Sequence, residues 1–545
     1  MRARAKQERT TPFLSHCRSY PLTPALSQRE REFFRWAFRI LDLSATIYQQ
    51  HRLRPRKLIL LWLAPIQAAS LFTVWAISAG GQTLRAWMLT ALLWLMTLPL
   101  LVSLEGTLVA MMLFEPFRGL LRRAQYLMVD YTTQDPIHLL TPVVTVLTMA
   151  VLMRKERLNI FRATPLAGLV SLLGLLCILE IFNPLQGGLV VGLSGALFML
   201  VPLAWFYFGQ AANERFIRLA LNLIVFVGIV ASLYGVYQML IGYPAFEQYW
   251  IDNTDLYSSI AVGHVRRALA TFSSAEEWGR YLEIGAIVAF GFAAAAKRIA
   301  NRIGWLVCGS ASTGAILLSG QRTAIFGLML GVATLVLLGA RSLSSAIGRL
   351  AIMLLPVVLV AAFVKAPTED EVWSKDEKQT VSTLLSHAQR GTLKPAEEDS
   401  LQVRFETWTQ LITQVIPSRP MGAGLGAGSL GEARFARGDE LPPIDNSILV
   451  MAIACGIPGA LLFVWILSRA TWLSLSMARR ALDGTRNADI KRIAASLMLP
   501  LVLNSVFGLT FTIYSVAPIA WLLIGWISAE TTRTRREAGR EIIEI

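Results

Sequence analysis

Runs of about twenty apolar residues recur from Leu58 almost to the end of the chain, separated by short polar and basic segments. A run of this length is what an α-helix needs to cross the hydrocarbon core of a bilayer. The runs are continuous rather than alternating, so they lack the pattern of transmembrane β-strands. The sequence therefore predicts an all-α polytopic membrane protein with about 12–14 transmembrane helices and one large loop.

The pattern gives a set of candidate spans that covers most of the chain. They are about 57–78, 85–104, 137–153, 164–183, 187–208, 216–242, 280–296, 303–319, 323–340, 348–365, 446–468, 490–510 and 512–529. This odd number cannot leave both termini on one side of the membrane, and segment 105–123 is the source of the conflict. It is a fourteenth crossing, or an interfacial helix with Arg118, Arg122 and Arg123 among the headgroups, or two early spans merge. The sequence leaves all three open.

Charge gives the expected orientation. Only 16% of residues are charged and the formal net charge is +15, with basic clusters in the short connections. Such clusters mark cytoplasmic loops, so the charge does not indicate a nucleic-acid partner. Counting back from the C-terminus then places two long segments on the side of the membrane opposite the cytoplasm, at about 243–279 and 365–445. Between positions 366 and 444 there are 12 acidic and 8 basic residues, unlike the inner loops.

The expected organisation has five parts. Residues 1–56 form a cytoplasmic, mostly disordered tail; because its stretch PLTPALSQRERE is similar to translated intergenic repeat DNA, we give it no functional weight. Transmembrane helices occupy 57–364 with an outer loop at about 243–279, the large outer loop occupies 365–445, and the last helices occupy 446–529, before a cytoplasmic tail at 530–545. Four scattered cysteines and five histidines make a metal centre or a disulfide framework unexpected, so we predict no cofactor and no metal.

Four stretches with potential chemistry lie at the same predicted membrane face. They are RRALATFSSAEEWGRYL at 266–282, SGQRTA at 319–324, SLQVRFETWTQLITQVIPSRPMGAGLGAGS at 400–429, and DNSILVMAIACGIPGALLFVWIL at 445–467. An arginine inside hydrocarbon costs at least ~2.5–3.5 kcal/mol, so Arg322 marks an edge or a site. Together with Arg267 and Arg404 it offers guanidinium groups that bind phosphate bidentately.

The remaining candidates have a structural alternative each. Asp445 and Asn446 stand where a loop enters a helix, so either is a helix cap or faces a substrate. The backbone of GAGLGAG, with Gly424 and Gly426, either approaches a ligand or forms an ordinary loop. Trp408 is a sugar platform or an interface aromatic, and Glu276 is a base or a solvated loop residue.

The order of these motifs resembles the O-antigen ligase/polymerase superfamily of bacterial inner membranes over about residues 260–470. The resemblance implies transfer of glycans from undecaprenyl diphosphate at the periplasmic face, without nucleotide or metal. The superfamily's ligases usually carry His-Asn at the loop-to-helix junction, where this chain has Asp445-Asn446. The difference favours a polymerase of O-antigen or exopolysaccharide, particularly of the exopolysaccharide type, over a ligase or protein oligosaccharyltransferase.

The expected roles follow from that chemistry. Arg322 and Arg267 bind the diphosphate, Arg404 orients the loop or the second substrate, and Asp445 or Glu276 is the base. Further binding residues are expected around them, namely Gln321, Trp408, Gly424, Gly426 and Asn446. Expected partners are the lipid-linked oligosaccharide, membrane lipid, a chain-length regulator and export proteins. A flippase for the same lipid is the alternative from another class, although the charges gather at a membrane face rather than at mid-membrane.

Overall fold

The computed structural model describes residues 83–127, 135–156, 160–161, 164–254, 261–262, 265–340, 344, 347–348, 350–351, 399–428, 444–481 and 487–543. The fold is all-α, apart from a hairpin of two-residue strands, β1 (Ala261–Val262) and β2 (Val265–Arg266). The predicted tail 1–56, the span 57–78, and most of the span 348–365 and of the loop 365–445 lie outside the described residues. The predicted fold class is confirmed.

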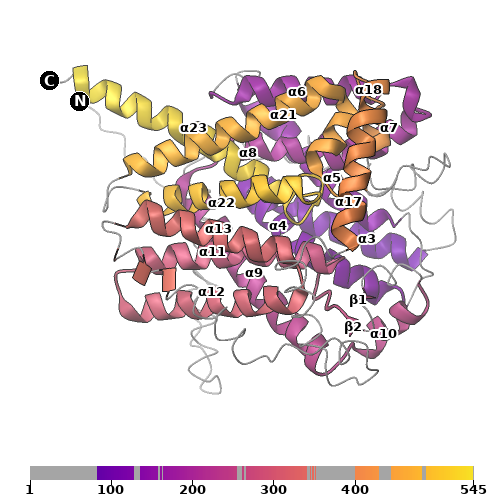
Figure 1. Ribbon diagram of the computed structural model, residues 1–545, viewed down its shortest axis with the longest axis horizontal. Coiled ribbons are helices and arrows are strands. Elements are labelled where there is room, and N and C mark those ends of the chain that lie inside the picture. The colour runs from indigo at the N-terminus through magenta and orange to yellow at the C-terminus, as the bar shows by residue number, and fades with distance from the viewer. Residues whose placement is uncertain are drawn as a thin grey trace, which may run out of the picture.

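Long helices packed side by side form the body of the molecule (Figure 1). A layer of four contains α11 (Ala275–Ala295), α12 (Ile299–Ser319), α13 (Arg322–Gly339) and α22 (Ala488–Val506). The helices around this layer are α3 (Thr83–Thr97), α4 (Leu104–Gln125), α5 (Leu140–Glu156), α6 (Ala167–Glu180), α7 (Leu189–Met199), α8 (Ala204–Ala211), α9 (Glu214–Leu240), α21 (Ser447–Arg480) and α23 (Ala517–Ile543). Short helices η2 (Leu98–Leu101), η3 (Pro136–Leu139), η5 (Pro184–Gln186) and η6 (Val201–Leu203) connect several of them.

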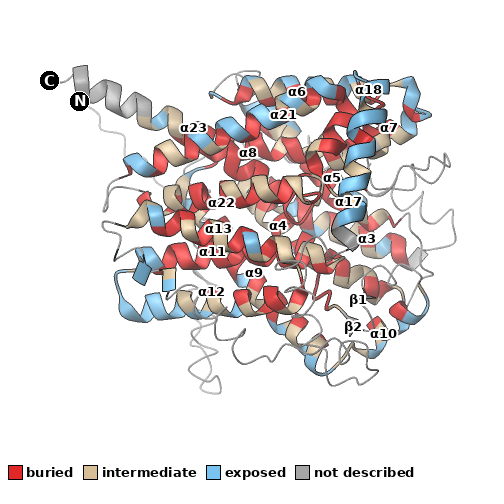
Figure 2. Cartoon of the chain, in the orientation of Figure 1, coloured by how far each residue is buried: buried red, intermediate tan, exposed pale blue. Residues whose placement is uncertain are grey.

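Within the described part of the chain, five helical stretches are long and apolar enough to cross a membrane. They are Pro136–Lys155, Leu189–Ala211, Glu214–Leu240, Arg322–Gly339 and Ser447–Arg480. Figure 2 shows buried residues concentrated in the middle of the bundle. Large apolar side chains also face outward, among them Leu461, Trp465 and Trp472 of α21, which are 63–65% exposed. An apolar exterior of this kind suits contact with lipid tails. The protein is a membrane protein.

Helix α4 covers the ambiguous segment 105–123 and packs along α9. At its start, Glu105 accepts a hydrogen bond of 2.6 Å from Asn213, the residue that caps the N-terminus of α9. Near its end, Arg123 donates to the carbonyl oxygen of Ala270, which Gln238 near the end of α9 also approaches. Helices α4 and α9 therefore begin together and end together. Of the three alternatives, this arrangement favours a full crossing; α4 is not among the five candidate spans, so the number of crossings here stays a prediction.

The glycine-rich stretch 422–428 interlocks with a kink in α21. Gly456 has φ +70° and ψ −177° inside that helix, and a side chain there would come within 2.4–2.7 Å of the backbone of residues 420–422. The N–H of Ile457 donates to the carbonyl of Pro420 over 2.9 Å, which replaces a bond that the kink breaks. Only glycine adopts this backbone without strain, so Gly456 in the stretch GIPG at 456–459 permits the kink.

Candidate active site at the arginine end of the bundle

The sequence candidates gather at one end of the bundle, which we call the arginine end. Arg267 follows the small hairpin, Arg322 is the first residue of α13, and Asp445 precedes α21. Arg404 lies on α17 (Asp399–Gln410), which runs across the ends of the long helices (Figure 1). The charges of Arg404 and Arg267 act on Arg322, and that of Glu276 acts on Arg267 and Asp445. Five charged candidates thus share one electrostatic environment.

Buried hydrogen bonds fix the loop that carries Arg267. Arg123 of α4 donates from Nη1 to the carbonyl of Phe272 over 2.5 Å, and from Nη2 to that of Ala270. The side-chain oxygen of Gln238 accepts from the N–H groups of Leu269 and Ala270 at 3.1 and 2.7 Å. Ala270 has φ +48°, a left-handed conformation that a non-glycine residue keeps only when its surroundings enforce it. The Arg267 loop is therefore held rigidly.

Arg322 stands at a tight connection between two helices. Gly320 ends α12 in the left-handed conformation, with φ +66°, and Gln321 precedes α13 without a side-chain capping bond. Instead, Gln321 packs on Gly279 of α11, where an added Cβ would lie 2.9 Å from the Cβ of Gln321. The close approach of α11 sets the position of Arg322 relative to Glu276. In this structure the side chain of Gln321 packs against α11.

The loop-to-helix junction separates the roles of Asp445 and Asn446. The side-chain oxygen of Asn446 accepts from the N–H groups of Ile448 and Leu449 at 2.9 and 3.0 Å, so Asn446 is the N-cap of α21. Asp445 does not cap the helix; instead its Oδ2 lies 3.2 Å from Nη2 of Arg404. Both side chains of that pair are more than one third exposed, at 36% and 37%. A ligand can therefore reach each of them.

Burial and neighbouring charge set the acidity of Asp445. Its pKa is raised above the ordinary value, chiefly because burial disfavours the charged carboxylate and also because Glu276 is close. Arg404 and Arg280 oppose this rise. A carboxylate of this kind is a stronger proton acceptor than an exposed aspartate.

Arg280 is a site residue that the sequence reasoning missed. Its side chain is 1% exposed, and Nη2 pairs with Oε1 of Glu276 one helical turn earlier, at 2.5 Å. Its guanidinium also donates to Thr510 and to the carbonyl of Phe507, at 3.2 and 3.4 Å. The signal was present, because an arginine at the start of an apolar run needs a partner and Glu276 stands at i−4. The buried Arg280 thus holds Glu276, whose side chain is 36% exposed, in an ion pair.

Trp408 packs beside this cluster. Its ring centroid lies 5.8 Å from that of Phe507 and 5.5 Å from that of Phe405. The contact holds α17 against the segment that follows α22. Helix α17 then continues through a π-helix (Leu411–Val415), α18 (Ile416–Ser418) and α19 (Leu425–Gly428). In this structure Trp408 is at least a packing residue.

Gly424 and Gly426 lie elsewhere, about two turns along α21. The N–H of Gly424 donates to the carbonyl of Ala454 at 3.2 Å, and that of Gly426 donates to the side chain of Gln186 at 3.0 Å. These amides are already used within the protein. Gly424 has φ +97°, and a side chain there would lie 2.4 Å from Gln186. Their glycines serve packing in this structure, and the expected contact with a ligand has no support from the geometry.

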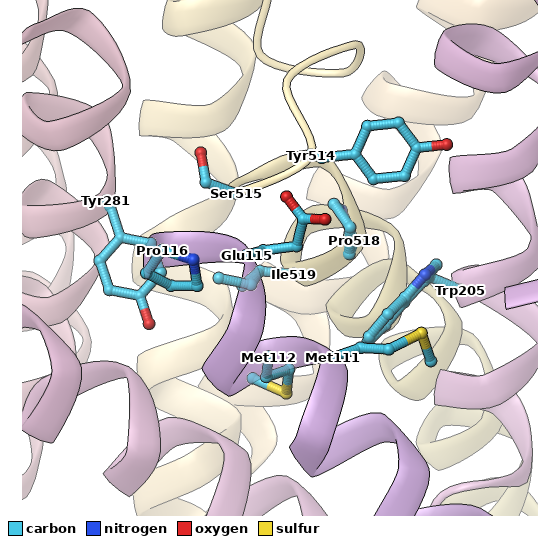
Figure 3. A pocket seen from close by; sticks show the side chains of 10 residues that line it. All are labelled: Met111, Met112, Glu115, Pro116, Trp205, Tyr281, Tyr514, Ser515, Pro518 and Ile519. Carbon is cyan, nitrogen blue, oxygen red and sulfur yellow. The ribbon is translucent and has the colours of Figure 1, made fainter. Parts of the chain in front are cut away.

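A small cavity lies apart from the arginine cluster, between α4, α8, α11 and the start of α23 (Figure 3). Its lining is mostly apolar and includes Met111, Met112 and Trp205, with the carboxylate of Glu115 among them. Glu115 is paired with Arg118 at 3.0 Å. No residue of the arginine cluster lines the cavity, so we assign it to helix packing. Among the described residues, no group of three or more His, Cys, Asp or Glu side chains is placed to hold a metal ion.

A family model described as O-antigen ligase matches residues 307–464. This match supports the O-antigen ligase/polymerase superfamily that the sequence motifs resemble. The match contains Arg322, Arg404 and Asp445, whereas Arg267 and Glu276 precede it. No curated protein matches the chain. The matched family contains glycan ligases and polymerases that act on lipid-linked oligosaccharides, so the match supports a membrane enzyme of this general kind; it does not distinguish the two activities.

Proposed function

We propose that this protein polymerises oligosaccharide repeat units carried on undecaprenyl diphosphate, at the periplasmic face of the bacterial inner membrane. The observation that carries the proposal is the gathering of Arg267, Arg322 and Arg404 around Asp445 at one end of the bundle. Three guanidinium groups and one carboxylate provide a diphosphate site beside a general base. The product is an O-antigen or an exopolysaccharide.

The reaction needs only these groups. A hydroxyl oxygen of the acceptor sugar attacks the anomeric carbon of the donor, and the bond from that carbon to the diphosphate oxygen breaks. Its electron pair leaves with undecaprenyl diphosphate, and the hydroxyl proton passes to Asp445. Arg267 and Arg322 stabilise the negative charge that develops on the departing phosphate. Arg404 orients the loop and the bound substrate.

Asp445 is a better base than Glu276 in this geometry. Glu276 is engaged by the buried Arg280 at 2.5 Å, and that pair is anchored further by Thr510. The partner of Asp445 is Arg404. The positive charge of Arg404 repels those of Arg267 and Arg322. A diphosphate placed among the three arginines competes for Arg404 and releases the Asp445 carboxylate to accept a proton. We therefore assign the base to Asp445 and a positioning role to Glu276.

Asp445-Asn446 at the loop-to-helix junction supports polymerisation over ligation. The ligase pattern carries a histidine where this chain has Asp445. The carboxylate supplies the base by itself, while Asn446 is used as the cap of α21. A chain-length regulator and export proteins are the partners that such a polymerase requires.

Purified protein in liposomes tests the function. We expect lipid-linked oligosaccharide to lengthen by whole repeat units without added nucleotide or metal. Transfer only to lipid A core or to protein would make the enzyme a ligase or an oligosaccharyltransferase. Movement of the lipid across the bilayer without new glycosidic bonds would make it a flippase. Reporter fusions within 365–445 that are active only in the cytoplasm would overturn the proposed orientation.

A further inference from the structure

A short helix beside Arg267 carries an exposed aromatic ring that the mechanism above does not use. Helix α10 (Ala245–Asp252) forms a small apolar cluster of its own from Trp250, Ile251 and Leu269, with Tyr126 packed against it. Tyr249 on the same helix is 50% exposed. Its ring centroid lies 5.5 Å from that of Tyr126, which supports it from one side. Tyr249 is thus half exposed while its ring rests against Tyr126.

Polar side chains surround this ring. Asp252 and Asn253 lie three and four residues after Tyr249, on the same helix face, and both are exposed. Gln248 donates to Asp252 at 2.7 Å, and the side-chain amide of Asn253 donates to the carbonyl of Tyr249 at 2.8 Å. An exposed aromatic face bordered by a carboxylate and carboxamides matches a sugar, whose C–H face stacks on a ring while its hydroxyls bind planar polar groups.

The helix and the Arg267 loop form one rigid unit. The Tyr243 hydroxyl donates to the carbonyl of Arg267 at 2.5 Å, two residues before α10 begins. Glu247 of α10 is fully buried and pairs with Arg123 at 2.7 Å, and Arg123 also holds the carbonyls of the loop. Gln238 donates to Glu247 at 2.7 Å and accepts from the loop amide of Ala270. A ligand whose phosphate lies at Arg267 therefore has a fixed neighbour in α10.

We propose that α10 is a carbohydrate platform, on which Tyr249, Asp252 and Asn253 bind the glycan of the lipid-linked substrate whose diphosphate lies at Arg267. The inference rests on the proposed function and adds the residues that recognise the sugar. The alternative is a tyrosine that anchors the protein in the lipid headgroups, as aromatic residues at membrane faces commonly do. A headgroup anchor requires only a large amphipathic side chain. Sugar binding requires the aromatic ring together with the polar side chains of Asp252 and Asn253 beside it.

Substitutions at Tyr249 separate the two. Lipid-linked oligosaccharide extracted from the producing strain is supplied to the full-length protein in liposomes. We expect Tyr249→Leu to raise KM about two- to tenfold with kcat unchanged, which corresponds to one lost stacking contact. Tyr249→Phe keeps the ring and remains near the wild type. Trp87→Leu is the matched control, because Trp87 is a 62% exposed aromatic residue on α3.

A binding measurement keeps the test independent of the polymerase assignment. Saturation-transfer NMR with the same oligosaccharide, released from its lipid, should show contact with the wild type and with Tyr249→Phe but not with Tyr249→Leu. That result supports the platform even if the enzyme proves to be a ligase. Equal effects of Tyr249→Leu and Trp87→Leu, or no sugar contact in the wild type, overturn the platform. Loss of elongation in Arg322→Ala beside an unaffected Tyr249→Leu removes the platform alone.

Discussion

Arg404 and Asp445 form an ion pair of 3.2 Å between helix α17 and the start of α21, and both remain partly exposed. The two residues come from opposite ends of a segment of 41 positions. A cation proposed for phosphate binding and a carboxylate proposed as base therefore neutralise each other before substrate arrives. An exposed pair of this kind contributes little to stability, about 0–1 kcal/mol. Its significance lies in the exchange of partners when a diphosphate binds.

Removal of the Asp445 carboxylate should stop the chemistry and leave the fold intact. We expect Asp445→Asn to lower kcat about 10²–10⁴-fold, because no other group replaces the lost base. Protein level and thermal stability should stay near those of the wild type, since Asn446 still caps α21. Elongation in liposomes and thermal unfolding in detergent measure the two effects. If Glu276→Gln lowers kcat more than Asp445→Asn does while the fold stays intact, Glu276 rather than Asp445 is the base.

The pH dependence of elongation should report Asp445. A base acts in its deprotonated form, so kcat/KM falls as pH decreases through its pKa, and that pKa is raised above the usual aspartate range by burial and by Glu276. Arg404 opposes the rise; hence Arg404→Gln should move the acidic limb of the profile to higher pH. Rates at several pH values for both proteins provide the measurement. A limb that does not move would show that Arg404 has no electrostatic effect on the base.

Arg322 should contribute to activity through the geometry of its planar guanidinium group as well as through its positive charge. We expect Arg322→Ala to reduce elongation about 10²–10³-fold, the usual effect of removing one donor to a developing anion. Arg322→Lys should recover little, because an ammonium cannot form two parallel bonds to a phosphate. In cells, both variants should insert into the membrane and accumulate single repeat units on the lipid carrier. Polymer of normal length from Arg322→Ala would remove the diphosphate site from this end of the bundle.

Hydrophobic periodicity predicted most of the helices because a segment that crosses lipid must bond all its backbone groups internally, which makes it a continuous apolar helix. The predicted spans 216–242, 303–319 and 323–340 correspond to α9 (Glu214–Leu240), α12 (Ile299–Ser319) and α13 (Arg322–Gly339). The pattern was ambiguous at 105–123, because the arginines there have partners such as Asp135 and Glu247 that are distant in sequence. Once paired, such charges are compatible with a crossing helix.

Site residues were predictable where topology alone decides their position. The alternation of spans predicts Arg267, Arg322 and Asp445 at one membrane face. It does not show which amides are already bonded, so the glycine-rich stretch was interpreted as a ligand loop although Gln186 and Ala454 use the N–H groups of Gly426 and Gly424. A local sequence pattern cannot show hydrogen-bond partners that come from distant segments of the chain.

Gly508 should be as necessary as the arginine it accommodates. An added Cβ at this position would lie 1.5 Å from Nη2 of Arg280, so Gly508→Ala must displace the guanidinium from Glu276 and Thr510. We expect the free energy of unfolding to fall by about 1–3 kcal/mol, the cost of leaving buried donors unsatisfied, and elongation to fall with it.

Gly304→Ala on α12 is the control, because nothing lies within 4 Å of a Cβ there. It should be neutral or stabilising by roughly 0.5–1 kcal/mol, as expected for alanine in a helix. Thermal unfolding in detergent and elongation in liposomes compare the two variants. If Gly508→Ala behaves like Gly304→Ala, Arg280 does not hold Glu276 in place, and both carboxylates at the arginine end would again be candidates for the base.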